Sequence, residues 1–98
     1  MIGRVEELAA EADDVASSRT ATGAEYRRGH HAFAAVDGRA VELRLPPEIA
    51  EAARRTPDTG ASSRGAAWVR FEPSAWDDHD RDRLEAWFRV AWRLAGDR

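Results

Sequence analysis

Residues 31–45 read HAFAAVDGRAVELRL, and this stretch decides the fold. Two extended-looking runs flank Asp37-Gly38, a dipeptide that strongly indicates a β-hairpin. A two-residue Asp-Gly loop would place Phe33 opposite Glu42, whereas a three-residue loop ending at a left-handed Gly38 places Phe33 opposite Val41. We favour the three-residue loop, because it converts the alternation of residue types into one buried inner face. That predicted face consists of Phe33, Ala35, Val41, Leu43 and Leu45.

The segment before the hairpin predicts one helix and one strand. Apolar residues recur every three or four positions from Ile2 to Ala16, with acidic residues between them, which is typical of an amphipathic helix. The stretch 17–23 has the composition of a turn or loop. Residues 24–28 read as a strand that leads into the hairpin.

The segment after the hairpin predicts a short helix and then a loop. Pro46-Pro47 begins the helix, since proline suits the first helical turn, and Ile49, Ala52 and Ala53 form its inner face. Residues 59–65 contain glycine and serine but no large apolar side chain. We expect them to form a mobile loop.

The chain ends in a strand and a long helix. Residues 66–72 read as a central strand, with Val69 and Phe71 on one face and Trp68 and Arg70 on the other. Ser74, with Asp77 three residues later, approximates a capping box at the start of the last helix. The apolar stripe of that helix comprises Leu84, Trp87, Phe88, Ala91, Trp92, Leu94 and Ala95.

Length and composition indicate one domain, 1–98, of the α+β class. The 43% apolar and 34% charged residues are ordinary for a chain that folds by itself. Cysteine is absent, which excludes disulfides and favours a reducing compartment. Acidic residues interrupt the start of the chain and no apolar run approaches the ~20 residues of a membrane span. We therefore expect a cytoplasmic protein without a membrane partner.

The charge balance does not support nucleic-acid binding. All fifteen basic residues are arginine, yet the net charge is −3, so no overall field attracts a phosphate backbone. Nucleic-acid binding would require a segregated basic face. Such a face would have to form locally from Arg27, Arg28, Arg39 and Arg44.

Three segments of this chain resemble small bacterial domains of the YjbR/MmcQ-like and TfoX N-terminal-like families. They are 33–38 (FAAVDG), 41–48 (VELRLPPE) and 65–71 (GAAWVRF), and Ala86-Trp87-Phe88 also fits. The likeness covers roughly residues 29–95 and is built from structural residues, whereas 56–65 departs from the pattern. The resemblance implies a two-layer α-β-α sandwich, with a curved antiparallel sheet of four or five strands packed against N- and C-terminal helices. It also implies a regulatory or DNA-binding role. No catalytic motif comes with the resemblance.

The sequence assigns no catalytic residue, no metal ligand and no cofactor. Neighbouring His30 and His31 point to opposite faces of a strand and so do not share one metal. No serine, histidine and acid share a positional signature such as Gly-x-Ser-x-Gly. The acids at 77–80 are explained by the positive end of a helix.

The best candidate for an anion site is the segment 59–65, which offers hydroxyls, backbone N–H groups and a guanidinium. A solvated connector is the alternative reading of the same residues. The candidate ligand-binding residues are Thr59, Ser62, Ser63, Arg64, Trp68, Trp76 and His31.

The sequence is compatible with two functions. The first is a non-enzymatic interaction or regulatory domain, which contacts a protein, a second copy of itself or DNA through the sheet face or through Trp76 and Trp92. The second is a small-molecule or anion-binding domain, for which His31, Arg64 and Trp68 would have to converge with Trp76 on one pocket. We rank the interaction domain first because no catalytic signature is present.

Overall fold

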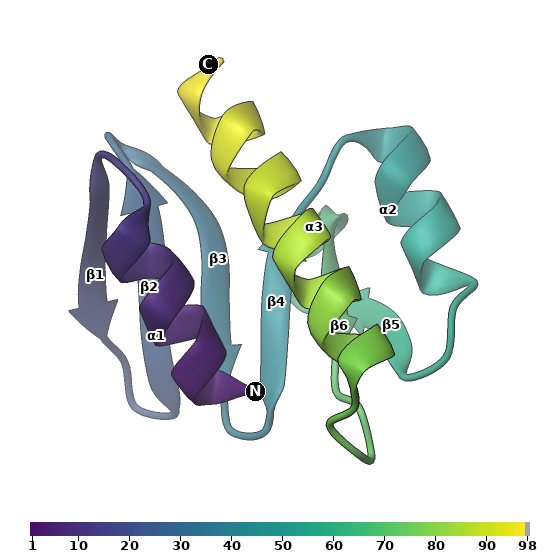
Figure 1. Ribbon diagram of the computed structural model, residues 1–98. Coiled ribbons are helices and arrows are strands. Elements are labelled where there is room, and N and C mark those ends of the chain that lie inside the picture. Colours follow the sequence, from purple (N-terminus) through teal and green to yellow (C-terminus); the bar gives the residue numbers. More distant parts are fainter. Residues whose placement is uncertain (98) are drawn as a thin grey trace.

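A computed structural model describes residues 1–97 (Figure 1). The described residues form three helices and six strands. In order, the elements are α1 (Ile2–Glu11), β1 (Val15–Arg19), β2 (Gly23–Arg28), β3 (His31–Asp37), β4 (Ala40–Arg44), α2 (Pro47–Arg54), β5 (Thr59–Ser62), β6 (Gly65–Phe71) and α3 (Asp78–Gly96). This order confirms the α+β class. None of the helices between residues 1 and 97 combines the length and the apolar character that crossing a membrane requires.

The strands form a single six-stranded sheet in the order β1-β2-β3-β4-β6-β5, and every neighbouring pair is antiparallel. The prediction of four or five strands is wrong because β1 and β5 carry no strand signal of their own. Both are edge strands made of small or polar residues. Pairing with a neighbour, rather than local propensity, makes them strands.

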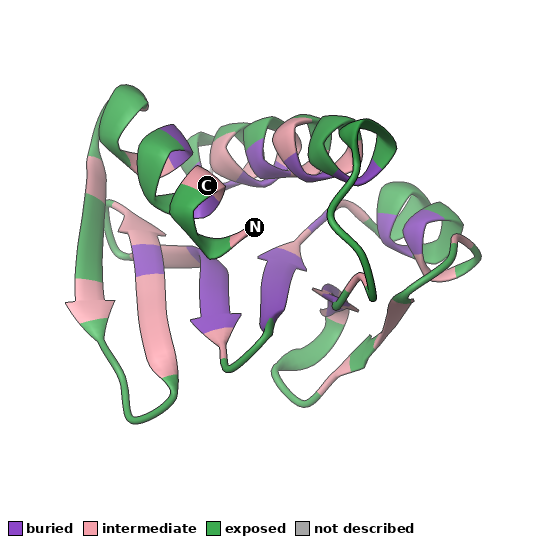
Figure 2. Cartoon of the chain, turned by 60° about the horizontal axis from the view of Figure 1, so that its bottom comes forward, coloured by how far each residue is buried: buried purple, intermediate pink, exposed green. Residues whose placement is uncertain are grey.

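All three helices bury side chains against one face of the sheet, so two layers are present (Figure 2). Buried residues are concentrated in β3, β4 and the underside of α3. Phe33 of β3 meets Phe88 of α3 edge to face, with ring centroids 5.4 Å apart. The helices contribute Val5, Leu8, Ala50, Ala53, Leu84, Phe88, Ala91 and Ala95 to this core. Within the described residues, the second face of the sheet carries no helix.

The β3–β4 hairpin has a register that neither predicted loop gives. Asp37 lies opposite Ala40 and Val36 opposite Val41, which leaves a two-residue turn of Gly38 and Arg39. Gly38 has a φ of 61° at the first turn position, as a type II′ hairpin turn requires. The sequence located the hairpin correctly but placed its turn too early.

This register changes which side chains reach the core. The inner residues are Ala34 and Val36, while Ala35 points to the open face in a row with Glu25 and Glu42. Phe33 still reaches the core, because a register shift in β2–β3 leaves it between two paired residues. The prediction for Ala35 is therefore wrong, and the predictions for Phe33, Val41, Leu43 and Leu45 are confirmed.

The first helix is shorter than its periodicity predicts. It ends at Glu11, and Asp14, with a φ of 59°, reverses the chain into β1. Val15 and Ala16, predicted to be helical, pair with β2 instead. Apolar spacing does not distinguish a helix end from a strand here, since the strand depends on pairing with Arg27 and Arg28 of β2.

The other two helices differ from prediction in their details. In α2 the buried residues are Ala50 and Ala53, whereas Ile49 is 36% exposed. Small alanines on the inner face let α2 lie close to β6. In α3 the N-cap is Asp77 rather than Ser74, and the Asp80 N–H donates to Asp77 Oδ1 at 2.8 Å.

Candidate functional site

The segment 59–65, predicted to be a mobile loop, is most of a β-hairpin. β5 runs from Thr59 to Ser62 and pairs with β6. Only Ser63 and Arg64 remain in the turn between the two strands. The loop prediction is therefore wrong: Thr59 and Ser62 lie in a strand, and Ser63 and Arg64 form the turn that follows it.

Thr59 binds the end of α2. Its hydroxyl lies 2.6 Å from the carbonyl oxygen of Ala53 and 2.7 Å from that of Thr56. The last carbonyl groups of a helix have no hydrogen-bond partners inside the helix. The Thr59 hydroxyl supplies such a partner at the C-terminus of α2. Thr59 is thereby occupied within the protein.

Ser62 and Arg64 lie on the open face of the sheet, within a group of paired polar side chains. We name this group the open-face network. Its members are Glu25, Asp37, Glu42, Ser62, Arg64 and Arg70.

Glu42 is the centre of the open-face network and is only 3% exposed. The Ser62 hydroxyl donates to its carboxylate. Arg64 Nε and Arg70 reach its two oxygens at 3.6 and 3.8 Å. A buried carboxylate is tolerated where such partners surround it.

The two arginines of the network also bind carboxylates at its rim. Arg64 donates to Glu25 at 2.9 Å and Arg70 donates to Asp37 at 2.7 Å. Hydrogen bonding from Thr22, and then from Arg70, lowers the pKa of Asp37. An anion bound here would have to separate an arginine from a carboxylate and then lie beside that carboxylate. The geometry therefore does not resemble a phosphate cradle.

The candidate ligand-binding residues do not gather in one place. Arg64 lies over the buried ring of Trp68, 5.0 Å from its centroid, so these two meet beside Ser62. His31 instead lines a shallow hollow near the end of α3. Trp76 lines a different hollow beside α1. Within residues 1–97 no three histidine, aspartate or glutamate side chains are grouped to hold a metal ion.

Trp92 makes several contacts with other residues of the protein. Its indole N–H donates to the carbonyl oxygen of Asp13 at 2.8 Å. Arg28 stacks on its ring at 3.7 Å and donates to its carbonyl oxygen at 3.1 Å. These contacts join α3 to β2 and to the turn after α1. Trp92 therefore has a clear structural role.

Trp76 differs from the other aromatic residues because it faces solvent. At 39% exposure it is the one aromatic side chain between residues 1 and 97 that is exposed. It lies in the connection between β6 and α3. The hollow beside it has a volume of about 560 Å³ and is lined by Met1, Gly3, Arg4, Glu7 and Arg81.

Two arginines that line the Trp76 hollow, Arg4 and Arg81, are held in place by one glutamate. Arg4 of α1 donates to Glu85 of α3 at 2.8 Å, and Arg81 donates to the same oxygen at 3.1 Å. Hydrogen bonding from Arg4, followed by that from Arg81, lowers the pKa of Glu85. The two helices that flank Trp76 are thus fixed relative to each other.

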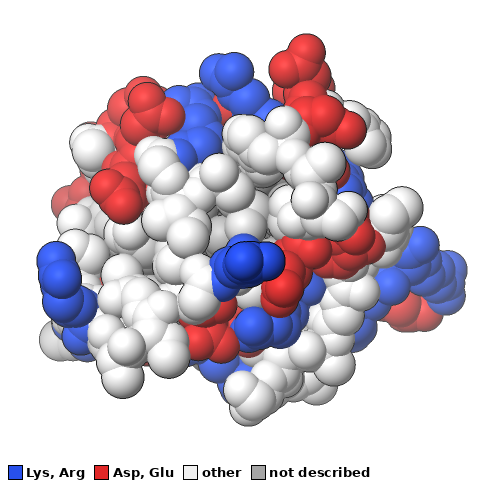
Figure 3. All heavy atoms as spheres, turned by 90° about the horizontal axis from the view of Figure 1, so that it is seen from below, with Lys and Arg blue, Asp and Glu red and all other residues white. Residues whose placement is uncertain are grey.

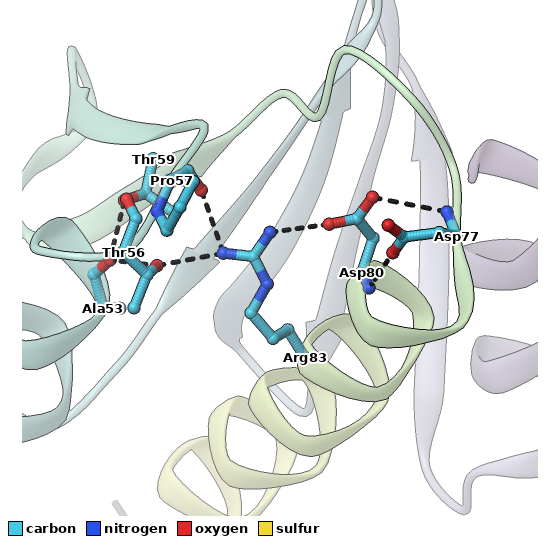
Figure 4. Close-up of polar contacts among 7 residues, drawn as sticks. All are labelled: Ala53, Thr56, Pro57, Thr59, Asp77, Asp80 and Arg83. Atoms are coloured by element: carbon cyan, nitrogen blue, oxygen red, sulfur yellow. Dashed lines mark hydrogen bonds and ion pairs between the residues drawn. The ribbon is translucent and has the colours of Figure 1, made fainter.

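A second polar cluster, which sequence reasoning missed, surrounds Arg83 (Figure 4). Arg83 donates to Asp80 Oδ1 at 2.7 Å, to the Pro57 carbonyl at 2.9 Å and to the Thr56 hydroxyl at 3.1 Å. Its guanidinium lies 4.7 Å from the ring centroid of Phe71. Arg83 thus ties the start of α3 to the α2–β5 turn. No local signal could reveal this, because the partners from that turn are more than 25 residues away.

The four arginines named from the sequence do not share one face. Arg27 donates to Ser18 on the open side of the sheet, whereas Arg28 stacks on Trp92 on the helix side. Figure 3 shows basic and acidic side chains interspersed on the face it presents. The four arginines named from the sequence therefore do not gather on one side.

Comparison of the chain with protein-family models, with curated proteins and with solved structures finds no match in any of the three.

Proposed function

We propose that this chain is a cytoplasmic, non-enzymatic interaction domain of the YjbR/MmcQ-like or TfoX N-terminal-like kind, and that it binds a protein partner around Trp76. The observation that carries the proposal is the exposure of Trp76 beside a hollow between α1 and the start of α3. Tryptophan is enriched among the residues that contribute most to protein interfaces. An exposed tryptophan that is not needed for packing is therefore a candidate anchor.

The surroundings of Trp76 match the composition of a protein interface. The hollow combines Trp76 and Met1 with the charged side chains of Arg4, Glu7 and Arg81. Interfaces commonly have an apolar centre with aromatic, methionine and arginine residues, and a polar rim. The resemblance to small bacterial regulatory domains supports the same class of function. It also implies a bacterial origin and a layered sheet with terminal helices.

The alternative, an anion site at 59–65, has less support. Its guanidinium, Arg64, is paired with Glu25 and Glu42, and its hydroxyls at Thr59 and Ser62 contact other groups of the protein. DNA binding also has less support, because the arginines named from the sequence do not share one face. Both alternatives remain outcomes of the experiment below.

The experiment compares Trp76→Ala with Ile49→Ala, which removes an equally exposed apolar side chain from α2. Proteins retained from a lysate of the source organism by the immobilised wild-type domain are quantified by mass spectrometry, and the strongest is purified for measurement of Kd. We expect Trp76→Ala to raise that Kd by about 30-fold, corresponding to about 2 kcal/mol, and Ile49→Ala to leave it within about twofold.

Urea unfolding separates loss of binding from loss of folding. We expect Trp76→Ala to change the free energy of unfolding by less than about 1 kcal/mol, as for a surface position. Equal retention by both variants, or binding of duplex DNA at low salt but of no protein, would overturn the proposal. A thermal shift with phosphate or carboxylates, abolished by Arg64→Ala, would favour the anion site instead.

A further inference from the structure

The sheet has two edges, and they are built differently. The β5 edge is short, its pairing with β6 shifts register between Ala61 and Ser62, and α2 packs against both strands. Short strands, irregular pairing and a covering helix are the means by which proteins keep a sheet edge from pairing with another chain. The β5 edge is therefore protected.

The β1 edge lacks these protections. β1 pairs with β2 through all five of its residues, and no register shift interrupts the described pairing. Its sequence, Val15-Ala-Ser-Ser-Arg19, contains no proline or glycine and has one charge, at its end. Figure 1 shows no other element of the described chain outside β1. An unbroken edge of this kind, with its single charge at one end, is a template for another strand.

The hydrogen bonds of the first hairpin establish which β1 groups face outward. The Thr20 N–H donates to the Gly23 carbonyl at 3.0 Å, which makes these two residues a hydrogen-bonded pair. Bonded and non-bonded pairs alternate along an antiparallel ladder. Val15, Ser17 and Arg19 therefore direct their N–H and C=O groups away from β2.

The next ladder supports this assignment. The Gly38 N–H donates to the Thr22 carbonyl at 2.8 Å, so the even-numbered residues at the start of β2 bond to β3. The odd-numbered residues, including Gly23 and Glu25, are then the ones that bond to β1. Both observations leave the same β1 groups unpaired at the edge.

These outward groups are self-complementary about Ser17. In an antiparallel pairing with a second copy, Ser17 would lie opposite Ser17 of that copy, and Val15 opposite its Arg19. All outward N–H and C=O groups of β1 would then find partners, in about six hydrogen bonds. We propose that two copies of this chain associate through β1 in this register, which joins their two sheets into one.

The side chains of β1 suit this pairing. Ala16 would face Ser18 of the second copy, so small side chains oppose each other on the open face. Arg19 would lie against Val15 of the second copy, next to the acidic pair Asp13-Asp14. The two Arg19 side chains would be separated by about 14 Å along the strands, which exceeds the screening length at physiological salt. No like charges oppose each other.

The first test measures molecular mass against concentration by sedimentation equilibrium. We expect the wild type to form dimers that dissociate on dilution, and Ser17→Pro to weaken dimerisation at least tenfold. Proline removes an N–H that faces the edge, where proline is compatible with a strand. Ser17→Ala keeps every backbone donor and is expected to dimerise as the wild type does.

The second test does not depend on the proline variant folding. The chain contains no cysteine, so Ser17→Cys introduces a single thiol at the proposed two-fold axis. Opposed residues have Cα atoms about 5.5 Å apart, within the range that a disulfide spans. We expect mild oxidation to cross-link Ser17→Cys across two copies at least tenfold faster than Ala16→Cys, which would lie opposite Ser18.

A wild-type monomer up to millimolar concentration, or equal cross-linking of both cysteine variants, would overturn the proposal. A dimer that survives Ser17→Pro and is lost in Trp76→Ala would also overturn it and would assign self-association to the Trp76 hollow. Loss of dimerisation in Ser17→Pro alone leaves the function proposed for Trp76 unaffected. The two proposals therefore fail separately.

Discussion

Glu42 shows how a single buried charge organises the open face of the sheet. Its carboxylate lies between Ser62, Arg64 and Arg70, which come from the β5–β6 hairpin. Leaving any of these polar groups without a partner carries a desolvation cost. Glu42 therefore connects β4 to the hairpin that was expected to be a loop.

We predict that Glu42→Gln lowers the free energy of unfolding by about 2 kcal/mol or more, because it leaves two arginines without their shared buried carboxylate. Urea unfolding followed by circular dichroism measures this change. Glu72→Gln is the matched control, since Glu72 is 50% exposed and also pairs with Arg70, at 3.6 Å. An exposed pair contributes at most about 1 kcal/mol. Equal effects of the two substitutions would contradict the central role of Glu42.

At the scale of elements, the start of α3 depends on a capping box that lies three residues later than the sequence suggests. Asp77 and Asp80 each accept a hydrogen bond from the backbone N–H of the other. Asp80 also receives a hydrogen bond from Arg83, which lowers its pKa. The helix start is thus coupled to the α2–β5 turn through Arg83.

Replacement of the cap tests this assignment directly. Asp77→Ala is expected to lower the free energy of unfolding by about 1 kcal/mol, the usual contribution of a helix cap. Ser74→Ala is expected to change it by less than about 0.5 kcal/mol, since Ser74 is exposed and precedes the cap. Thermal or urea unfolding of the two variants distinguishes them. A larger effect at Ser74 would show that the helix begins where the sequence pattern indicated.

At the scale of the whole molecule, three carboxylates are bound by arginines that connect separate elements of the fold. Asp37, Asp80 and Glu85 are each bound by an arginine, and hydrogen bonding lowers the pKa of each. In the unfolded chain these groups titrate at their ordinary values, 3.8 for aspartate and 4.5 for glutamate. On acidification the unfolded state therefore takes up protons before the folded state does.

The free energy of unfolding is accordingly expected to be constant near neutral pH and to fall as the pH decreases below about 5. Urea unfolding between pH 3 and 7 measures this dependence. Glu85→Gln removes one contributing carboxylate and is expected to make the free energy of unfolding fall less steeply with decreasing pH. Glu51→Gln, which changes an exposed pair within α2, is expected to leave that dependence unchanged. A wild-type free energy that rises on acidification would contradict the assigned pKa directions.

The sequence by itself determined the elements whose signals are local. The β3–β4 hairpin, the strand 66–72 with Val69 and Phe71 facing inward, and the long C-terminal helix follow from alternation, turn residues and helical periodicity. The sequence also indicates Trp76 as a candidate contact residue, since it lies in a connection and not in an apolar stripe. These features depend on neighbours within a few positions along the chain.

Only the tertiary structure decided the rest, because the deciding contacts depend on how the strands pair and not on the residue types of each segment alone. β1 and β5 are strands because β2 and β6 offer them hydrogen bonds, although their own residues indicate a helix end and a loop. The pairing of Arg64 with Glu25, 39 residues away, determines whether the predicted anion site is free. Local spacing does not encode such pairings, so the open-face network and the uncovered β1 edge emerge only when the sheet is assembled.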